Sequence, residues 1–185
     1  MQLDHERRLL AKLVREITRA ETQAIEHAPR EARHLGEVPP VLALRDVANH
    51  SASMRPRLLG MLEAYDLRIG RRGLGATLAT LRHLVVDHAV DPERSFRTAL
   101  LDLRHGLDVA QLLRDAARRE VLFGVVRWCD DWLGTRRTLV ARAAAQLAWF
   151  VEQASLAVEP LPFAEDLDVT ASADDLDDWH ADRTT

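Results

Sequence analysis

Two glutamates are the residues of this 185-residue chain best placed for metal chemistry. Glu21 shares an apolar helical stripe with Ile17 and Ala24, which predicts that its carboxylate points inward. Glu120 lies on the seam of Leu113 in a later helix, at the edge of the apolar stripe. Inward carboxylates from two helices of a bundle could hold a hard metal ion such as iron, manganese or magnesium. The alternative is that each glutamate reaches solvent or pairs with one of the 24 arginines.

Three further groups of reactive side chains have weaker support. His88 follows an apolar helical face, where a hydrogen-bonded core histidine is the simpler interpretation than a ligand. Asp46 and His50 have a usable i, i+4 ligand spacing, but they lie opposite Leu44 and are expected at the surface. Cys129 is expected near the outer edge of its helix, without the basic surroundings that a catalytic thiolate needs. No residue is therefore assigned a catalytic role, and whether the chain is an enzyme stays open.

Helical periodicity organises the elements that carry these residues. A glycine-rich loop is expected at residues 66–75, followed by a shorter helix at 76–89. Later in the chain, a helix break is expected at His105-Gly106 and a tight turn at residues 134–137. No segment alternates with the period of a β-strand. Short connections favour an all-α, antiparallel four-helix bundle over residues 1–158, with short extra helices. The four long helices are predicted at residues 4–35, 41–66, 92–133 and 138–156.

Composition narrows the class of protein. One cysteine excludes an internal disulfide, and no apolar run approaches the length of a membrane span, so we expect a cytoplasmic protein without membrane contact. Residues 159–185 form a tail with a charge of −8, which leaves +4 on the rest of the chain. Because nucleic-acid binders carry a stronger and more clustered positive charge, we expect no nucleic-acid partner.

Two segments suggest protein contacts. The run 121–126, VLFGVV, is apolar on all sides and lies beside Trp128 and Trp132, which predicts a homodimer or larger assembly. The acidic tail is too polar to form a core of its own. It either stays solvated or docks, with Trp179 as its anchor, on the positively charged remainder of its own chain or on a partner.

The layout of the chain resembles the YciF-like branch of the ferritin-like superfamily. The resemblance rests on LRDVANHSASMRPRLLGMLEAYDLRIGRRGLGATLATLRHLVVDH and on GLDVAQLLRDAARREVLFGVVRWCDDWLGTRRTLVARAAAQLAWFVEQA, and it covers about residues 5–156. It implies a four-helix bundle, often dimeric, with a carboxylate di-metal site and an association with stress responses. It would make Glu21, His50 and Glu120 the metal ligands.

The ligand set that this resemblance implies is incomplete. Asp46 stands four residues before His50, where the ferritin-like pattern has a glutamate three before, and the last helix offers AAAQLAWF without carboxylates. We therefore expect no cofactor or, failing that, iron or manganese. The first function hypothesis is a bundle that acts through self-association or partner binding, with its metal chemistry degraded or absent.

Two alternatives remain. The first is a metal-dependent oxidase or a peroxide-handling stress protein that uses the same three residues. The second comes from LRDVANH, which also resembles the second-helix histidine segment of DinB-like and mycothiol-dependent bundles. That resemblance would require two further ligands after His50.

Overall fold

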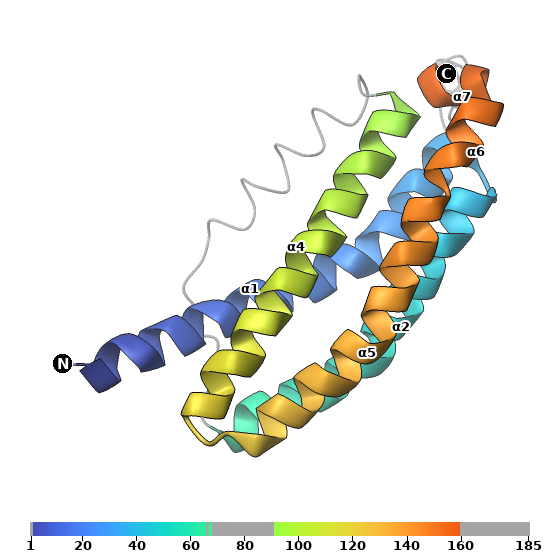
Figure 1. Cartoon of the computed structure of the whole chain (residues 1–185). Helices are drawn as coiled ribbons and strands as arrows, with labels where there is room; N and C mark the ends of the chain where they lie inside the picture. The colour runs from blue at the N-terminus through green and yellow to red at the C-terminus, as the bar shows by residue number, and fades with distance from the viewer. Residues whose placement is uncertain (1, 66, 68–90, 160–185) are drawn as a thin grey trace, which may run out of the picture.

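The computed structural model describes residues 2–65, 67 and 91–159. The predicted helix 76–89, with His88, and residues 160–185 of the acidic tail, with Trp179, lie outside the described residues. The described part of the chain is helical and contains no strand, as the periodicity predicted. Its helices are α1 (Gln2–Leu35), α2 (Pro39–Ala64), α4 (Pro92–Arg119), α5 (Phe123–Ala145), α6 (Leu147–Glu152) and α7 (Ala154–Val158) (Figure 1).

Four long helices pack against one another as a bundle. Helix α1 packs along α2 and α4, and α5 packs along the same two helices (Figure 1). Connections of only three residues, 36–38 and 120–122, make α1 antiparallel to α2 and α4 antiparallel to α5. The all-α bundle predicted from the sequence is therefore confirmed at this level. No helix in the described ranges has both the length and the apolar character that a membrane span requires.

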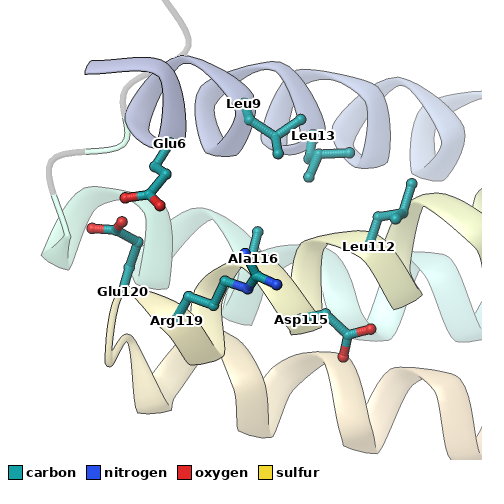
Figure 2. A pocket seen from close by; sticks show the side chains of 8 residues that line it. All are labelled: Glu6, Leu9, Leu13, Leu112, Asp115, Ala116, Arg119 and Glu120. Atoms are coloured by element: carbon teal, nitrogen blue, oxygen red, sulfur yellow. The ribbon is translucent and has the colours of Figure 1, made fainter. Parts of the chain in front are cut away.

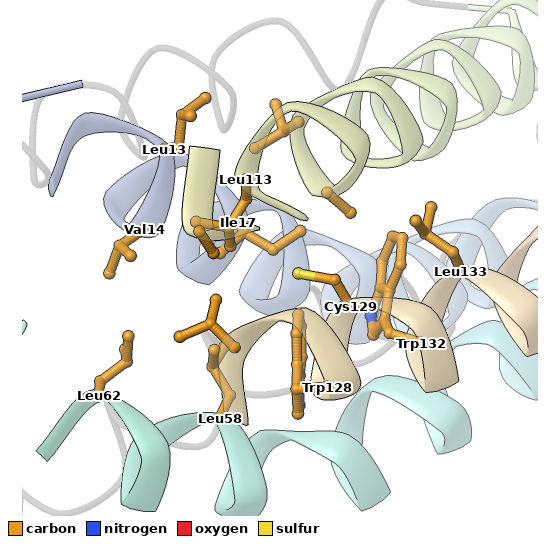
Figure 3. Packing of buried hydrophobic residues seen from close by; sticks show 14 of the residues in the cluster. Leu13, Val14, Ile17, Leu58, Leu62, Leu113, Trp128, Cys129, Trp132 and Leu133 are labelled. Carbon is orange, nitrogen blue, oxygen red and sulfur yellow. The ribbon is translucent and has the colours of Figure 1, made fainter. Parts of the chain in front are cut away.

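The core follows the apolar stripes of the long helices. Leu13, Val14 and Ile17 of α1 meet Leu58 of α2 and Leu113 of α4 in one cluster of buried side chains (Figure 3). A second cluster fills the other half of the bundle, where Phe96 and Phe150 pack with their ring centroids 5.3 Å apart. The stripe predicted for α1 is thus confirmed.

The helix boundaries predicted at Gly106 and at residues 134–137 are wrong. Helix α4 runs through Gly106, where a Cβ atom would make an ordinary van der Waals contact, 3.5 Å from Cβ of Ala20. Helix α5 runs through residues 134–137, and a Cβ atom on Gly134 would meet nothing within 4 Å. The chain turns instead at residues 120–122, where Val121 has a φ of 59°.

Cys129 and the neighbouring tryptophans lie in the core of the same chain. Trp128 and Trp132 are at most 2% exposed, and their rings stack with centroids 6.1 Å apart (Figure 3). They therefore need no second subunit to bury them, and this part of the argument for a dimer is wrong. Cys129 is fully buried rather than at an outer edge, because α5 packs against both α2 and α4. Burial raises the pKa of its thiol to about 12, which removes the thiolate that a nucleophile needs.

Candidate functional site

A buried ion pair joins three helices at the middle of the bundle. Arg136 of α5 donates from Nη2 to Oε1 of Glu21 on α1 at 2.8 Å, and to Oγ of Ser51 on α2 at 2.6 Å. The Ser51 hydroxyl lies 3.3 Å from the same Glu21 oxygen and donates to it. All three residues are at most 1% exposed, so this charge pair is shielded from water.

His50 and Trp132 complete the surroundings of Arg136. The guanidinium Nε donates to Nδ1 of His50 at 3.2 Å, which requires that Nδ1 carries no proton. The guanidinium carbon also lies 4.6 Å from the centre of the Trp132 ring, a distance typical of a cation–π contact. Burial and the neighbouring Arg136 charge lower the pKa of His50 to about 4, so its imidazole is neutral at neutral pH.

The electrostatics of the pair are dominated by burial. Burial raises the pKa of Glu21, while the charge of Arg136 and the polar groups of Trp132 and Ser51 oppose that shift. Burial likewise lowers the pKa of Arg136, and Glu21 opposes it. The second carboxylate oxygen of Glu21 and Nε1 of Trp132 complete no hydrogen bond within the described residues. Each charge is thus retained in the interior chiefly because the other is present.

The three predicted metal ligands do not form one site. Glu21 and His50 do converge, but on the Arg136 guanidinium, which already carries a positive charge. Glu120 lies beside Glu6, which is 15 residues before Glu21 and therefore about 22 Å away along α1. Within the described residues, no three side chains of His, Cys, Asp or Glu are grouped to hold a metal ion. Asp46 is exposed and pairs with Arg142 at 3.5 Å.

A second buried polar group lies between α1 and α4 and was missed from the sequence. His27, Glu31 and His34 are at most 6% exposed. The Ser95 hydroxyl donates to Oε1 of Glu31 at 2.6 Å, and Nε2 of His27 lies 3.6 Å from Oδ2 of Asp102. A signal was present, because Glu31 continues the stripe of Ala24, Ala28 and Leu35 at helical spacing. These residues help to join α1 to α4 with polar contacts.

Glu120 lines a surface groove between α1 and α4. The groove has a volume of about 230 Å³, and its floor and walls include Leu13 and Ala116. Figure 2 shows Glu6 of α1 and Glu120, the residue that follows α4, at the same end of the groove, with their carboxylates facing one another. Glu120 thus belongs to the molecular surface and not to the bundle interior.

The turn beside this groove exposes apolar side chains. Val121 is 62% exposed and Phe123 is 68% exposed. A positive φ is unfavourable for a β-branched residue, so Val121 holds a strained backbone at an exposed position. The turn is tied to the end of α2, where Oη of Tyr65 accepts a hydrogen bond from the backbone N–H of Gly124 at 3.1 Å.

No protein-family model, curated protein or solved structure matches this chain.

Proposed function

We propose that this chain is a non-catalytic helical bundle that acts through self-association, and that the turn between α4 and α5 is its contact surface. The supporting observation is the pair of exposed apolar side chains at this turn, Val121 and Phe123, next to a backbone with positive φ. Two neighbouring exposed apolar side chains at the end of a bundle would suit a protein–protein contact.

Both features of the turn are unfavourable in an isolated chain. The left-handed conformation of Val121 costs about 1–2 kcal/mol, and its exposed side chain recovers little of this by burial. Burial of an exposed phenylalanine such as Phe123 against a second subunit would contribute about 1.5–3 kcal/mol. Association therefore offsets a local cost that the single bundle does not.

The interior supports the non-catalytic part of the proposal. Arg136 donates to one carboxylate oxygen of Glu21, to Oγ of Ser51 and to Nδ1 of His50, and its charge repels a metal cation at this place. The alternative of a metal-dependent oxidase therefore has weaker support. A ferritin-like origin, with its iron or manganese site lost, remains our interpretation of the helix layout.

Sedimentation of a charged variant at micromolar concentration tests the contact surface. We expect the wild-type chain to sediment as a dimer or larger, and F123D to sediment as a 20.9 kDa monomer. The matched control is V151D, because Val151 is 82% exposed on α6 and is expected to keep the wild-type size. A monomeric wild type, or an F123D variant of unchanged size, would contradict the proposal.

Metal analysis tests the non-catalytic part separately. Protein purified from medium supplemented with iron and manganese is expected to contain neither metal in stoichiometric amount. Two metal ions per chain, lost on substitution of Glu21 or His50, would favour the oxidase alternative instead.

A further inference from the structure

The groove between α1 and α4 has two helical walls. Along α1 its lining residues are Glu6, Leu9 and Leu13, which are three and four residues apart. On the other side, the lining residues fall on one face of α4 and on the residue that follows it: Leu112, Asp115, Ala116, Arg119 and Glu120. Two helices with such surface rows leave a channel between them that accepts the side-chain ridge of a third helix.

The size and composition of the groove fit side chains better than a free small molecule. Its volume of about 230 Å³ is below the roughly 300 Å³ at which ligand pockets begin. Leu9 and Leu112 are 49% and 58% exposed at its edge, whereas Leu13 is buried at its floor. A partner that buries both exposed leucines would need apolar side chains along one face.

The charged side chains of the groove are Glu6, Asp115, Arg119 and Glu120, and the end with Glu6 and Glu120 favours a basic group. Asp115 is already paired with Arg114, at 3.2 Å between Nη2 and Oδ1. The carboxylates of Glu6 and Glu120 form no hydrogen bond or ion pair within the described residues, and they face one another at one end of the groove (Figure 2). Two facing carboxylates repel, and a guanidinium or ammonium group between them would satisfy both.

We propose that this groove binds a basic amphipathic helix of another protein, with apolar anchors on Leu9, Leu13 and Leu112 and a basic side chain between Glu6 and Glu120. Phe123 does not line the groove, although Glu120 at one end of the groove lies in the same turn. The leucine anchors are a different set of residues from Val121 and Phe123, so the inference goes beyond the proposed self-association. Recognition of this kind uses anchors three or four residues apart and weakens with salt at the charged end.

Two fluorescent peptides about four turns long test the proposal by anisotropy titration of the full chain. Both carry the same leucine face, and one has arginines where the other has glutamates. We expect the arginine peptide to bind, to weaken with added salt, and to bind at least about tenfold more tightly than the glutamate peptide. Equal binding of both peptides, or no binding of the arginine peptide, would overturn the proposal.

Variants locate the binding at the groove. E6R/E120R is expected to lower the affinity for the arginine peptide by at least about tenfold. A116F, which fills the groove without changing its charge, is expected to lower this affinity by a similar factor. The control E26R places the same charge on an exposed position of α1 outside the groove and is expected to bind like wild type. Wild-type affinity in both groove variants would overturn the proposal.

The F123D variant separates this inference from the proposed function. It is expected to bind the arginine peptide with wild-type affinity while it sediments as a monomer. If F123D changes the assembly but no variant binds peptide, only the groove proposal fails. If E6R/E120R or A116F alone dissociates the wild-type assembly, a second copy of this chain occupies the groove and the basic helix does not.

Discussion

The middle of the bundle and its end at the α4–α5 turn use their residues in opposite ways. In the middle, Glu21, Arg136 and His50 have the types and proximity that chemistry requires, yet they satisfy one another. At the end, Val121 and Phe123 have no chemistry to offer, yet they are left exposed on a strained backbone. The reactive residue types in the middle thus contact one another, whereas the exposed side chains of the turn are apolar. This contrast is the basis of the proposed self-association.

The buried pair has an asymmetric energy. Removing two charges from water costs several kcal/mol for each ion, and their attraction only repays that cost while both are present. Replacement of both Glu21 and Arg136 by apolar residues is therefore expected to change the free energy of unfolding little. Loss of only one of the two charges is expected to lower it greatly. We expect the pair to fix the register of α1 against α5, because each of these two helices packs mainly on α2 and α4.

The largest expected effect comes from removal of one charge. R136M should lower the free energy of unfolding by about 3–5 kcal/mol, because it leaves the Glu21 carboxylate buried without its partner. The double variant E21L/R136M should recover most of this loss, since apolar groups replace both charges. Urea denaturation followed by circular dichroism measures both.

A neighbouring arginine provides the control for this first prediction. R137M removes an exposed guanidinium one residue away and should change the free energy of unfolding by less than about 0.5 kcal/mol. A double variant as unstable as R136M would show that the polar contacts with Ser51 and His50, and not the charge balance, stabilise the centre.

The inward position of Glu21 was predictable, and its partner was not. Glu21 shares a regular stripe with Ile17 and Ala24, and burial of that stripe confirmed its orientation. Arg136 lay in a segment predicted as a turn because of Gly134, although that glycine occupies an exposed helical position. The charge-balancing partner of a buried glutamate depends on helix packing, which residue spacing on one helix does not define.

The turn between α4 and α5 was not predicted, for a related reason. Residues 120–122 contain neither glycine nor proline, so they carry no local turn signal. Gly106 carries that signal but lies inside α4, where a Cβ atom would stand at an ordinary contact distance of 3.5 Å from Cβ of Ala20. The four long helices could therefore be predicted as a set, whereas the boundary between the last two was displaced by more than ten residues.

A smaller effect is expected from protonation of His50. Its pKa is about 4 in the folded chain and near 6.5 ordinarily, so below pH 6.5 the unfolded chain takes up a proton that the folded chain does not. Titration of His50 therefore leaves the free energy of unfolding unchanged above pH 6.5 and lowers it as the pH decreases toward 4. Because His50 is only half-buried, we expect a loss of about 1–2 kcal/mol over this range.

The variant H50N isolates this contribution. The asparagine side-chain oxygen can replace Nδ1 as an acceptor for Arg136 but does not titrate. The difference in stability between wild type and H50N, from denaturation at a series of pH values, should be flat above pH 6.5 and should fall below it. H105N controls for loss of an exposed histidine elsewhere on α4. A difference that is flat over the whole range would remove His50 from the charge balance of the centre.

The smallest effect, and the sharpest test of the comparison, is expected at Val121. V121G relieves the left-handed strain, worth about 1–2 kcal/mol, but adds freedom to the unfolded chain, so the net stabilisation should be about 0.5–1 kcal/mol. The same substitution at the exposed helical Val151 should destabilise the chain by about 0.5 kcal/mol. V121G should also weaken self-association, because it removes an apolar side chain from the proposed contact. Denaturation of the two variants measures these opposite changes in the free energy of unfolding, and sedimentation measures the assembly. A V121G chain that is less stable but assembles normally would show that the backbone strain at Val121 serves the fold and not the contact.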